Sequence, residues 1–423
     1  MRMQVLSRIE LLHEDDESGL YGIIDDVICE HARSKWIPLQ DRIALRRSIF
    51  ASVRGLDAIQ ELIDDETITE IMVNGQDDIF IERNGHLERA ACSFDSRDKL
   101  DDIVQKIAAG ANRVINEASP IVDARLADGS RVNMILPPIS LCGPIITIRK
   151  FPREVMTMER LIELESLSVE AAHFLKDLVT GGYNIFVSGG TGSGKTTFLN
   201  ALSEYIPLDE RIVTIEDSAE LQLGRIPNLV RLEVRNANVE GRNEITIRDL
   251  IKASLRMRPD RIIVGEVRDA ACIDMLQAMN TGHSGMSTGH ANSTSDMLSR
   301  METMTLLGAD IPLLAVRRQI ASAIDIIIQL ARFRDRSRRV VEITEVAGYK
   351  DGEIILNPLF KFTEKGEENG RICGALEPTG NRLLRDEKLR AAGIQAVCHE
   401  QGGTDTGSAD GSGNHSRSFS AVL

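Results

Sequence analysis

The sequence lacks any apolar run long enough to cross a membrane. Its longest apolar stretches, residues 134–148 and 320–331, are interrupted by prolines in the first and by Asp325 in the second, whereas a spanning helix needs about 20 apolar residues. The amino terminus reaches acidic residues before any apolar segment of useful length, which is not the pattern of a secretory signal. We therefore expect a protein that works in the cytoplasm.

Paired cysteines and an excess of basic charge are also missing. The six cysteines form no C-x-x-C pair and have no histidine beside them at metal-ligand spacing, so neither structural zinc nor a disulfide framework is expected. The formal net charge of −14 disfavours unspecific binding of nucleic acid, because neutralising phosphates requires a basic face. We expect no direct nucleic-acid partner, although a local basic patch is compatible with this charge.

What is present is a chain of 423 residues, of which 42% are hydrophobic and 27% charged, as in soluble proteins of two or three domains. Near the start, apolar positions such as Leu45, Ile49 and Val53 recur at three- and four-residue steps, which indicates helices. Two strand-like runs then end in Asn-Gly, at residues 74–75 and 84–85, a strong turn signal. Further along, helical and apolar β patterns alternate, as in a parallel sheet covered by helices.

These patterns predict an α/β protein in which smaller segments precede the main domain. Pro152 interrupts the chain ahead of that domain and marks a linker. After about residue 400 the chain is rich in glycine, serine and aspartate, and cannot bury enough apolar surface to order itself. The predicted layout is a helical N-terminal extension at 1–60, an α+β N-terminal domain at 61–150, a linker at 151–158, the main α/β domain at 159–362, a C-terminal appendage at 363–402 and a disordered tail at 403–423.

The strongest motif is a phosphate-binding loop of the Walker A pattern inside the main domain. It follows a strand pattern at 183–187 and precedes a helix from Thr196, the two contexts that such a loop requires. Its glycines let backbone N–H groups converge on phosphate oxygens at a helix N-terminus. Lys195 is expected to reach the β- and γ-phosphates and the Thr196 hydroxyl to hold Mg²⁺, so ATP and Mg²⁺ are the predicted cofactors. The predicted binding residues here are Gly189, Gly190, Thr191, Gly192, Ser193, Gly194, Lys195, Thr196 and Thr197.

Two further strand patterns end in carboxylates, at the place where an α/β sheet delivers side chains to its ligand. The strand at 211–215 is followed by Glu216 and Asp217, an acidic pair that fits either a helix N-cap or a base that activates the attacking water. The strand at 261–266 has Gly265 in the usual place of an aspartate, with Glu266 after it. Glu266 can still reach a Mg²⁺-bound water, so the division of roles between Glu216 and Glu266 stays open.

Two histidines and a cluster of arginines complete the candidate residues. His283 and His290 lie seven apart in a Gly/Ser/Thr-rich segment predicted to be a loop, and this spacing disfavours a zinc site. They are either satisfied loop histidines or sensors of the γ-phosphate, and the nearby P-loop favours the sensors. Residues 332–339 hold five arginines in eight positions between two strand patterns. A solvated hairpin tip is the first interpretation of this run, and contact with an anionic partner is the second.

Taken in chain order, these motifs resemble those of the secretion ATPase superfamily. The resemblance rests on the P-loop, the acidic box at 211–220, the modified Walker B segment at 257–268 and the paired-histidine box, and it extends from about residue 60 to 395. Within that superfamily, Ile-Met-Val-Asn-Gly at 71–75 and the segment 123–133 are similar to the CpaF/TadA branch. Members of that branch energise the assembly of tight-adherence (Flp) or related type IV pili.

The resemblance implies a fold, a site and partners. The fold is a RecA-like P-loop NTPase domain behind a smaller α+β domain, with ATP held between the two, assembled as a homohexamer at the cytoplasmic face of the inner membrane beside an integral platform protein. Glu216 is then the general base, Glu266 supports Mg²⁺ and the lytic water, and His283 and His290 form the sensor box. Arginines of the N-terminal domain that would reach nucleotide phosphates are Arg125, Arg131 or Arg149.

The implied function is an ATP-hydrolysing motor that powers pilus assembly or protein secretion, of the Flp, type IV pilus or type II secretion kind. A motor of a conjugative or type IV secretion system is the alternative, and neighbouring genes for prepilins or for a relaxase would distinguish the two. A further alternative is a scaffold that binds ATP without hydrolysing it. The presence of Lys195, Thr196, Glu216 and Glu266 argues against that scaffold.

Overall fold

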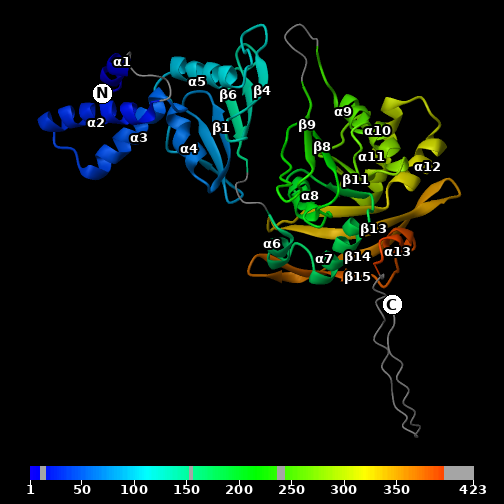
Figure 1. The fold of residues 1–423 in the computed structure, drawn as a ribbon. Helices are drawn as coiled ribbons and strands as arrows, with labels where there is room; N and C mark the ends of the chain where they lie inside the picture. Colours follow the sequence, from blue (N-terminus) through cyan, green and yellow to red (C-terminus); the bar gives the residue numbers. More distant parts are fainter. Residues whose placement is uncertain (10–15, 152–155, 236–242, 395–423) are drawn as a thin grey trace, which may run out of the picture. The chain divides into compact units, whose positions relative to one another are not determined.

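The structure is a computed structural model, and it describes residues 1–9, 16–151, 156–235 and 243–394. The chain forms two compact units (Figure 1): the described residues as far as Phe151 belong to the first, and nearly all of those from Met156 on belong to the second. The tail predicted at 403–423 lies outside the described residues, as does much of the predicted linker. Each unit is described by itself.

The first unit begins with three helices, α1 (Arg2–Ile9), α2 (Glu17–Ser34) and α3 (Leu39–Val53). At the start of α2 the Asp16 side chain accepts a hydrogen bond from the Gly19 N–H, which satisfies one of the unpaired donors of a helix N-terminus. The three helices share a small apolar core that is separate from the rest of the unit and consists of Val5, Leu20, Ile24, Val27, Ile28 and Ile49.

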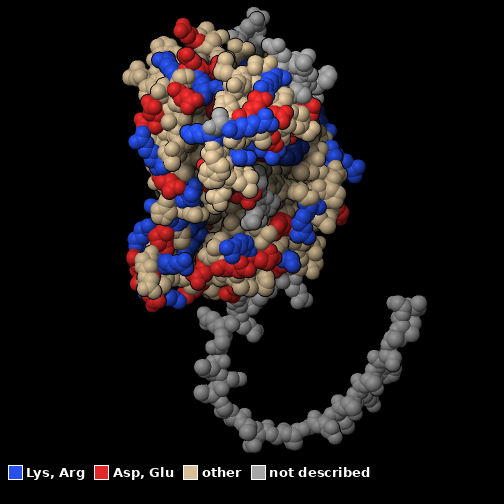
Figure 2. Space-filling view, turned by 90° about the vertical axis from the view of Figure 1, so that its left-hand side faces the viewer, with Lys and Arg blue, Asp and Glu red and all other residues tan. Residues whose placement is uncertain are grey.

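The remainder of the first unit is an antiparallel sheet with the strand order β3-β2-β1-β6-β5-β4. The buried apolar side chains of its strands share one core with η1, α4 and α5, and the positions between them along the strands are more exposed. Acidic and basic side chains are mixed over the face displayed in Figure 2. The elements are η1 (Asp57–Ile59), α4 (Gln60–Asp64), β1 (Ile68–Asn74), β2 (Ile79–Arg83), β3 (His86–Arg89), α5 (Arg97–Gly110), β4 (Ile121–Arg125), β5 (Arg131–Ile135) and β6 (Ile145–Arg149).

The second unit is a nine-stranded sheet with helices on both faces (Figure 1). Its elements are α6 (Met158–Glu163), α7 (Val169–Thr180), β7 (Ile185–Gly189), α8 (Lys195–Ser203), β8 (Ile212–Glu216), β9 (Leu229–Glu233), α9 (Ile247–Ser254), β10 (Arg261–Val264), α10 (Ala271–Asn280), β11 (Ser284–Gly289), α11 (Thr294–Gly308), α12 (Leu313–Ala323), β12 (Ile326–Arg332), β13 (Arg338–Lys350), β14 (Glu353–Glu368), β15 (Arg371–Pro378) and α13 (Glu387–Ala391).

The strand order is β15-β14-β13-β12-β7-β11-β10-β8-β9, and within it the neighbouring strands β12-β7-β11-β10-β8-β9 are all parallel. One face packs on α7 and α8 and the other on α9 to α12, which is why the central strands are buried along their whole length. The antiparallel strands β13 to β15 extend the same sheet to Pro378, beyond the domain end predicted at 362. None of the described helices is both long and apolar enough to span a membrane.

The segment predicted as a Gly/Ser/Thr-rich loop is in fact a central strand, β11, between β7 and β10. Glycine and serine have low β propensity, so the local pattern did not indicate a strand. The small residues are required by the neighbours: a methyl group on Gly285 would lie 2.5 Å from Met279 Cε, and one on Gly289 would lie 2.9 Å from the Phe186 ring. Packing therefore overrides local propensity here.

Candidate nucleotide-binding site

The P-loop connects β7 to α8 at the carboxyl edge of the parallel strands. α8 begins at Lys195, after Gly194 in the left-handed conformation with φ of 90°. Gly189 cannot carry a side chain, because a methyl group there would lie 2.5 Å from Ser193 Oγ and 2.7 Å from the Leu330 carbonyl oxygen. The result is a tightly closed glycine-rich turn that leads into a helix N-terminus, the arrangement that binds phosphate groups.

The Lys195 side chain is buried and folds back over this loop. Its Nζ donates a hydrogen bond to the Gly190 carbonyl oxygen at 3.1 Å and lies 3.2 Å from Nδ1 of His290. Because an ammonium group can only donate, Nδ1 is the acceptor and the imidazole proton is on Nε2. That nitrogen lies 2.8 Å from Oε1 of Glu266. His290 thus joins the P-loop lysine to a carboxylate two strands away.

The charge state of His290 agrees with this role. Burial lowers the pKa of His290, and the positive charge of Lys195 lowers it further, against the opposing effect of Glu266. The unperturbed pKa of histidine is about 6.5, so the imidazole is neutral at pH 7. A neutral ring can accept from Lys195 on one side and donate to Glu266 on the other, whereas a protonated ring could not accept.

Glu266 is held through one of its carboxylate oxygens. Oε2 accepts a hydrogen bond of 2.6 Å from Nη2 of Arg268, whereas Oε1 lies 2.8 Å from Nε2 of His290 without a hydrogen bond to any described residue. Burial by itself would raise the pKa of Glu266, but the hydrogen bond and charge of Arg268 outweigh it and hold the pKa below its usual range. A carboxylate of low basicity that is already paired with an arginine is poorly suited to take a proton. The sequence-based prediction gave no role to Arg268.

Glu216, at the end of β8, has the opposite environment. It is 2% exposed, and its Oε2 accepts hydrogen bonds from the backbone N–H groups of Glu220 at 2.6 Å and Leu221 at 2.8 Å. Oε1 is buried and finds no hydrogen-bond partner within the described parts of the chain. Burial raises the pKa of Glu216, against the effect of these two backbone hydrogen bonds. A raised pKa and an oxygen that still needs a donor suit a general base that acts on water.

Gly265 and Glu216 are directly related. A methyl group on Gly265 would lie 3.0 Å from Cγ of Glu216 and 3.6 Å from its Oε2. An aspartate at this position would displace the Glu216 side chain and place a second negative charge beside it. The glycine in place of the usual aspartate therefore makes room for the buried glutamate of the neighbouring strand.

The donors near the P-loop fit Mg²⁺ that is bound together with a nucleotide. Within the described ranges, no group of three or more His, Cys, Asp or Glu side chains could hold a metal ion alone. Mg²⁺ retains several waters and is commonly held by one or two protein oxygens plus substrate phosphates. The Thr196 hydroxyl in the first turn of α8 and the Glu266 carboxylate are oxygen donors of this kind.

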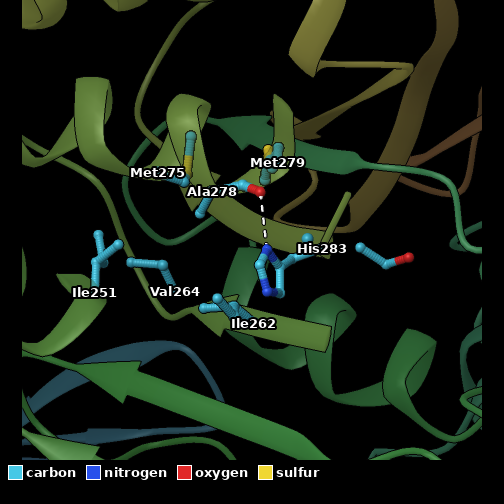
Figure 3. Close-up of a pocket in the computed structure, with 9 residues that line it drawn as sticks. Ile251, Ile262, Val264, Met275, Ala278, Met279 and His283 are labelled. Carbon is cyan, nitrogen blue, oxygen red and sulfur yellow. Dashed lines mark hydrogen bonds between the residues drawn. The ribbon is translucent and has the colours of Figure 1, made fainter. Parts of the chain in front are cut away.

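His283 lies at the opposite end of β11 from His290. Six residues form this strand, and a strand of that length spans roughly 20 Å. His283 Nδ1 lies 3.3 Å from the Ala278 carbonyl oxygen and 3.2 Å from Thr281 Oγ1. Within one subunit the structure brings His290 to Lys195 and leaves His283 at the amino edge of the sheet. Figure 3 shows the ring of His283 beside a small apolar cavity lined by Ile251, Ile262, Val264, Met275 and Met279.

The three candidate arginines of the first unit form one row across its sheet. Arg125 is opposite Arg131, and Arg131 is opposite Arg149. Side chains that are directly opposed on neighbouring strands lie on the same face, and like charges so placed repel one another. Nε of Arg149 lies 3.9 Å from Oε1 of Glu70. The row gathers positive charge on one face, which suits contact with an anion.

The fold and the site together define a P-loop nucleotide-binding protein whose RecA-like domain follows a smaller α+β domain in the chain. Residues 53–382 match the family described as Type II/IV secretion system protein. A protein of Mycobacterium tuberculosis named for conjugal transfer is 35% identical over 308 residues, covering 71% of this chain and 87% of the relative. The type IV secretion system protein PtlH of Bordetella pertussis is 34% identical over 325 residues, covering 70% of this chain and 94% of the relative.

The chain therefore belongs to the Type II/IV secretion system protein family, a family of secretion ATPases. Among solved structures, the pilus retraction motor PilT with bound ADP matches with a TM-score of 0.50 at 19% identity, covering 79% of this chain and 86% of that chain. A likeness at this identity concerns the fold. The predicted superfamily and the predicted RecA-like fold class are confirmed.

Proposed function

We propose that this chain is an ATP-hydrolysing motor subunit of a conjugative or type IV secretion system. The observation that carries hydrolysis is the buried Glu216, whose pKa is raised and whose Oε1 needs a hydrogen-bond donor. The choice of system rests on the names of the relatives, which refer to conjugal transfer and type IV secretion. They favour this alternative over the Flp pilus motor that the sequence first indicated. Pilus assembly remains the second candidate, supported by the CpaF-like segments 71–75 and 123–133.

The site residues divide the work of phosphoryl transfer as follows. The P-loop N–H groups and Lys195 hold the phosphates, and Mg²⁺, when bound with the nucleotide, neutralises charge on the β- and γ-phosphates. Thr196 would hold that ion directly, and Glu266 would hold it through water. Glu216 accepts a hydrogen bond from the attacking water through Oε1 and takes its proton. The low basicity of Glu266 supports this division, because of these two carboxylates Glu216 is the one whose pKa is raised, as a base requires.

His290 links occupancy of the P-loop to Glu266. To bind a phosphate, the Lys195 ammonium gives up at least part of its contact with the Gly190 carbonyl oxygen and His290 Nδ1. His290 then loses a donor on one side while it still faces Glu266 on the other. The imidazole would therefore respond to the arrival and loss of the γ-phosphate, which supports its role as a sensor. His283, at the other end of β11, is proposed to sense nucleotide only in the context of the assembled ring.

The working form is proposed to be a homohexamer that acts on an integral inner-membrane protein of the secretion system. The row formed by Arg125, Arg131 and Arg149 supports a role for the N-terminal domain in completing nucleotide sites. Hydrolysis would then change the relation between domains around the linker, a hinge movement that a membrane partner can follow.

The experiment that tests this proposal is ATP hydrolysis by the purified chain at increasing protein concentration, with Glu216→Gln beside it. Turnover that rises more than linearly with concentration and is lost in the variant is expected. The variant should still bind ADP, because Gln keeps an acceptor for the N–H groups of Glu220 and Leu221. Unchanged turnover in Glu216→Gln would remove this residue from the base role, and no turnover by the wild type would leave a scaffold. Neighbouring genes for a relaxase rather than prepilins would support the conjugative system.

A further inference from the structure

Two arginines from the hairpin between β12 and β13 lie against the P-loop. A methyl group on Gly192 would lie 3.5 Å from Nη1 of Arg332, and one on Gly194 would lie 3.4 Å from Cδ of Arg338. Both arginines are exposed. The glycines of the loop therefore face a cationic surface that comes from a segment more than a hundred residues further along the chain.

Two other arginines of this hairpin have structural tasks. Arg334 forms ion pairs with Glu364 at 2.7 Å and Glu367 at 2.9 Å on β14. Arg339 is buried and donates a hydrogen bond of 2.7 Å to the Ile372 carbonyl oxygen on β15. These two residues hold the hairpin to the extended sheet, so the solvated-tip interpretation does not describe the whole run. Arg332 and Arg338 differ from them because Nη1 of Arg332 and Cδ of Arg338 lie beside the phosphate-binding loop.

The sheet register places these two cations directly opposite each other. Arg332 pairs with Arg338 across β12 and β13, and like charges in opposed positions destabilise a sheet. The register is fixed by Leu330 and Val340, which lie two residues further in on the same face and are buried in the core shared with α8. An anion bound beside the two guanidinium groups would relieve their repulsion.

The strand order indicates which part of a nucleotide they meet. Glu216, Glu266 and His290 lie at or just beyond the ends of β8, β10 and β11, all on one side of β7, whereas β12 and β13 lie on its other side. The γ-phosphate must lie on the side of the hydrolysing carboxylates. The nucleoside end of the polyphosphate then lies toward β12 and β13, where guanidinium groups can form charge-assisted hydrogen bonds with phosphate oxygens.

We propose that Arg332 and Arg338 bind the α-phosphate of the nucleotide that the P-loop holds. This inference rests on the proposed nucleotide site but concerns binding alone. Both ATP and ADP carry an α-phosphate, so the pair contributes equally to substrate and product. It sets the affinity of the site for nucleoside di- and triphosphates and leaves the chemical step to residues on the other side of β7.

The test measures ADP and ATP affinity of the full chain by titration calorimetry for wild type, Arg332→Ala, Arg338→Ala and the double variant. Loss of one charge-assisted hydrogen bond weakens binding roughly 10-fold or more, and we expect this loss for both nucleotides alike. In steady-state hydrolysis KM rises and kcat stays within about twofold of the wild type. Arg334→Ala, in the same hairpin but paired with β14, is the matched control and leaves both affinities unchanged.

A measurement on the wild-type chain makes the test independent of any variant. Modification of arginines by phenylglyoxal, followed by peptide mass spectrometry, should be suppressed by ADP at Arg332 and Arg338 and not at Arg334. Equal modification with and without ADP would overturn the proposal, as would a double variant that binds ADP like the wild type. A fall in kcat with unchanged ADP affinity would also overturn it, because that result assigns the pair to the γ-phosphate. If the wild type binds ADP through these arginines but does not hydrolyse ATP, the proposed function fails and this inference stands.

Discussion

Gly265 stands where strands of this kind usually carry an aspartate, and restoring that aspartate should inactivate the protein. A methyl group at this position would already lie 3.0 Å from Cγ and 3.6 Å from Oε2 of Glu216. Gly265→Asp adds both bulk and a negative charge beside a carboxylate whose pKa is already raised by burial. The substitution should therefore displace the proposed base and keep it protonated.

The magnitude follows from the separation of the two carboxylates. Two unit charges about 4 Å apart repel by roughly 4 kcal/mol at an effective dielectric constant of 20. If all of this repulsion opposes ionisation of Glu216, the rate of ATP hydrolysis falls on the order of 10³-fold. Gly265→Asn has nearly the same shape without the charge, so it reports the steric part alone. We expect Gly265→Asn to retain at least about tenfold more activity than Gly265→Asp.

The assay is the pH dependence of kcat for the wild type and both variants, with ADP affinity as the check that the P-loop is intact. In Gly265→Asp the acidic limb of the profile should move to higher pH, because the second carboxylate raises the pKa of Glu216 further. ADP affinity should change little in either variant. Wild-type activity in Gly265→Asp would refute the reasoning, and equal activities of the Asp and Asn variants would remove charge as its cause.

The remaining predictions concern Glu216 and His290. Burial raises the pKa of Glu216 above its ordinary value of 4.5, so the ionised Glu216 carboxylate destabilises the folded state. The free energy of unfolding therefore declines as the pH rises from the ordinary pKa through the raised pKa of the folded state. Glu216→Gln should therefore melt at a higher temperature than the wild type at pH 7 in calorimetry, with the gap closing near pH 4; a gap independent of pH would contradict this. His290→Asn should lower kcat by about 10²-fold while ADP binding stays within about threefold; loss of ADP binding instead would make His290 a ligand of the loop rather than a sensor.

The features that could be predicted from the sequence are those encoded within one continuous segment. The P-loop, with its strand before and helix after, is such a segment, and the structure has β7 and α8 in these places. Glu216 and Glu266 could be found because each lies at or just beyond the end of an apolar strand, and parallel strands deliver their ends to one edge of the sheet. Their different environments could not be predicted, since those depend on Arg268, on His290 and on the missing side chain of Gly265.

The features that could not be predicted depend on contacts between distant segments. Arg332 and Arg338 reach the P-loop only because β12 pairs with β7, and no local pattern reveals that pairing. The strand β11 was hidden because its serine and glycine residues are chosen for the space left by neighbouring side chains. The row of Arg125, Arg131 and Arg149 required the register of three strands. In each case the information lies in tertiary packing, which single-sequence patterns do not contain.

The small residues of β11 also bear on how this sheet can change during evolution. Space that a strand would ordinarily fill with its own side chains is occupied here by Met279 beside Gly285 and by Phe186 beside Gly289. Volume at the centre of the sheet is thus shared between positions far apart in sequence. A larger residue in the strand becomes acceptable only when its neighbour shrinks, so these sites are expected to change as pairs. The strand that joins the two histidines is accordingly constrained by its surroundings as much as by its own residues.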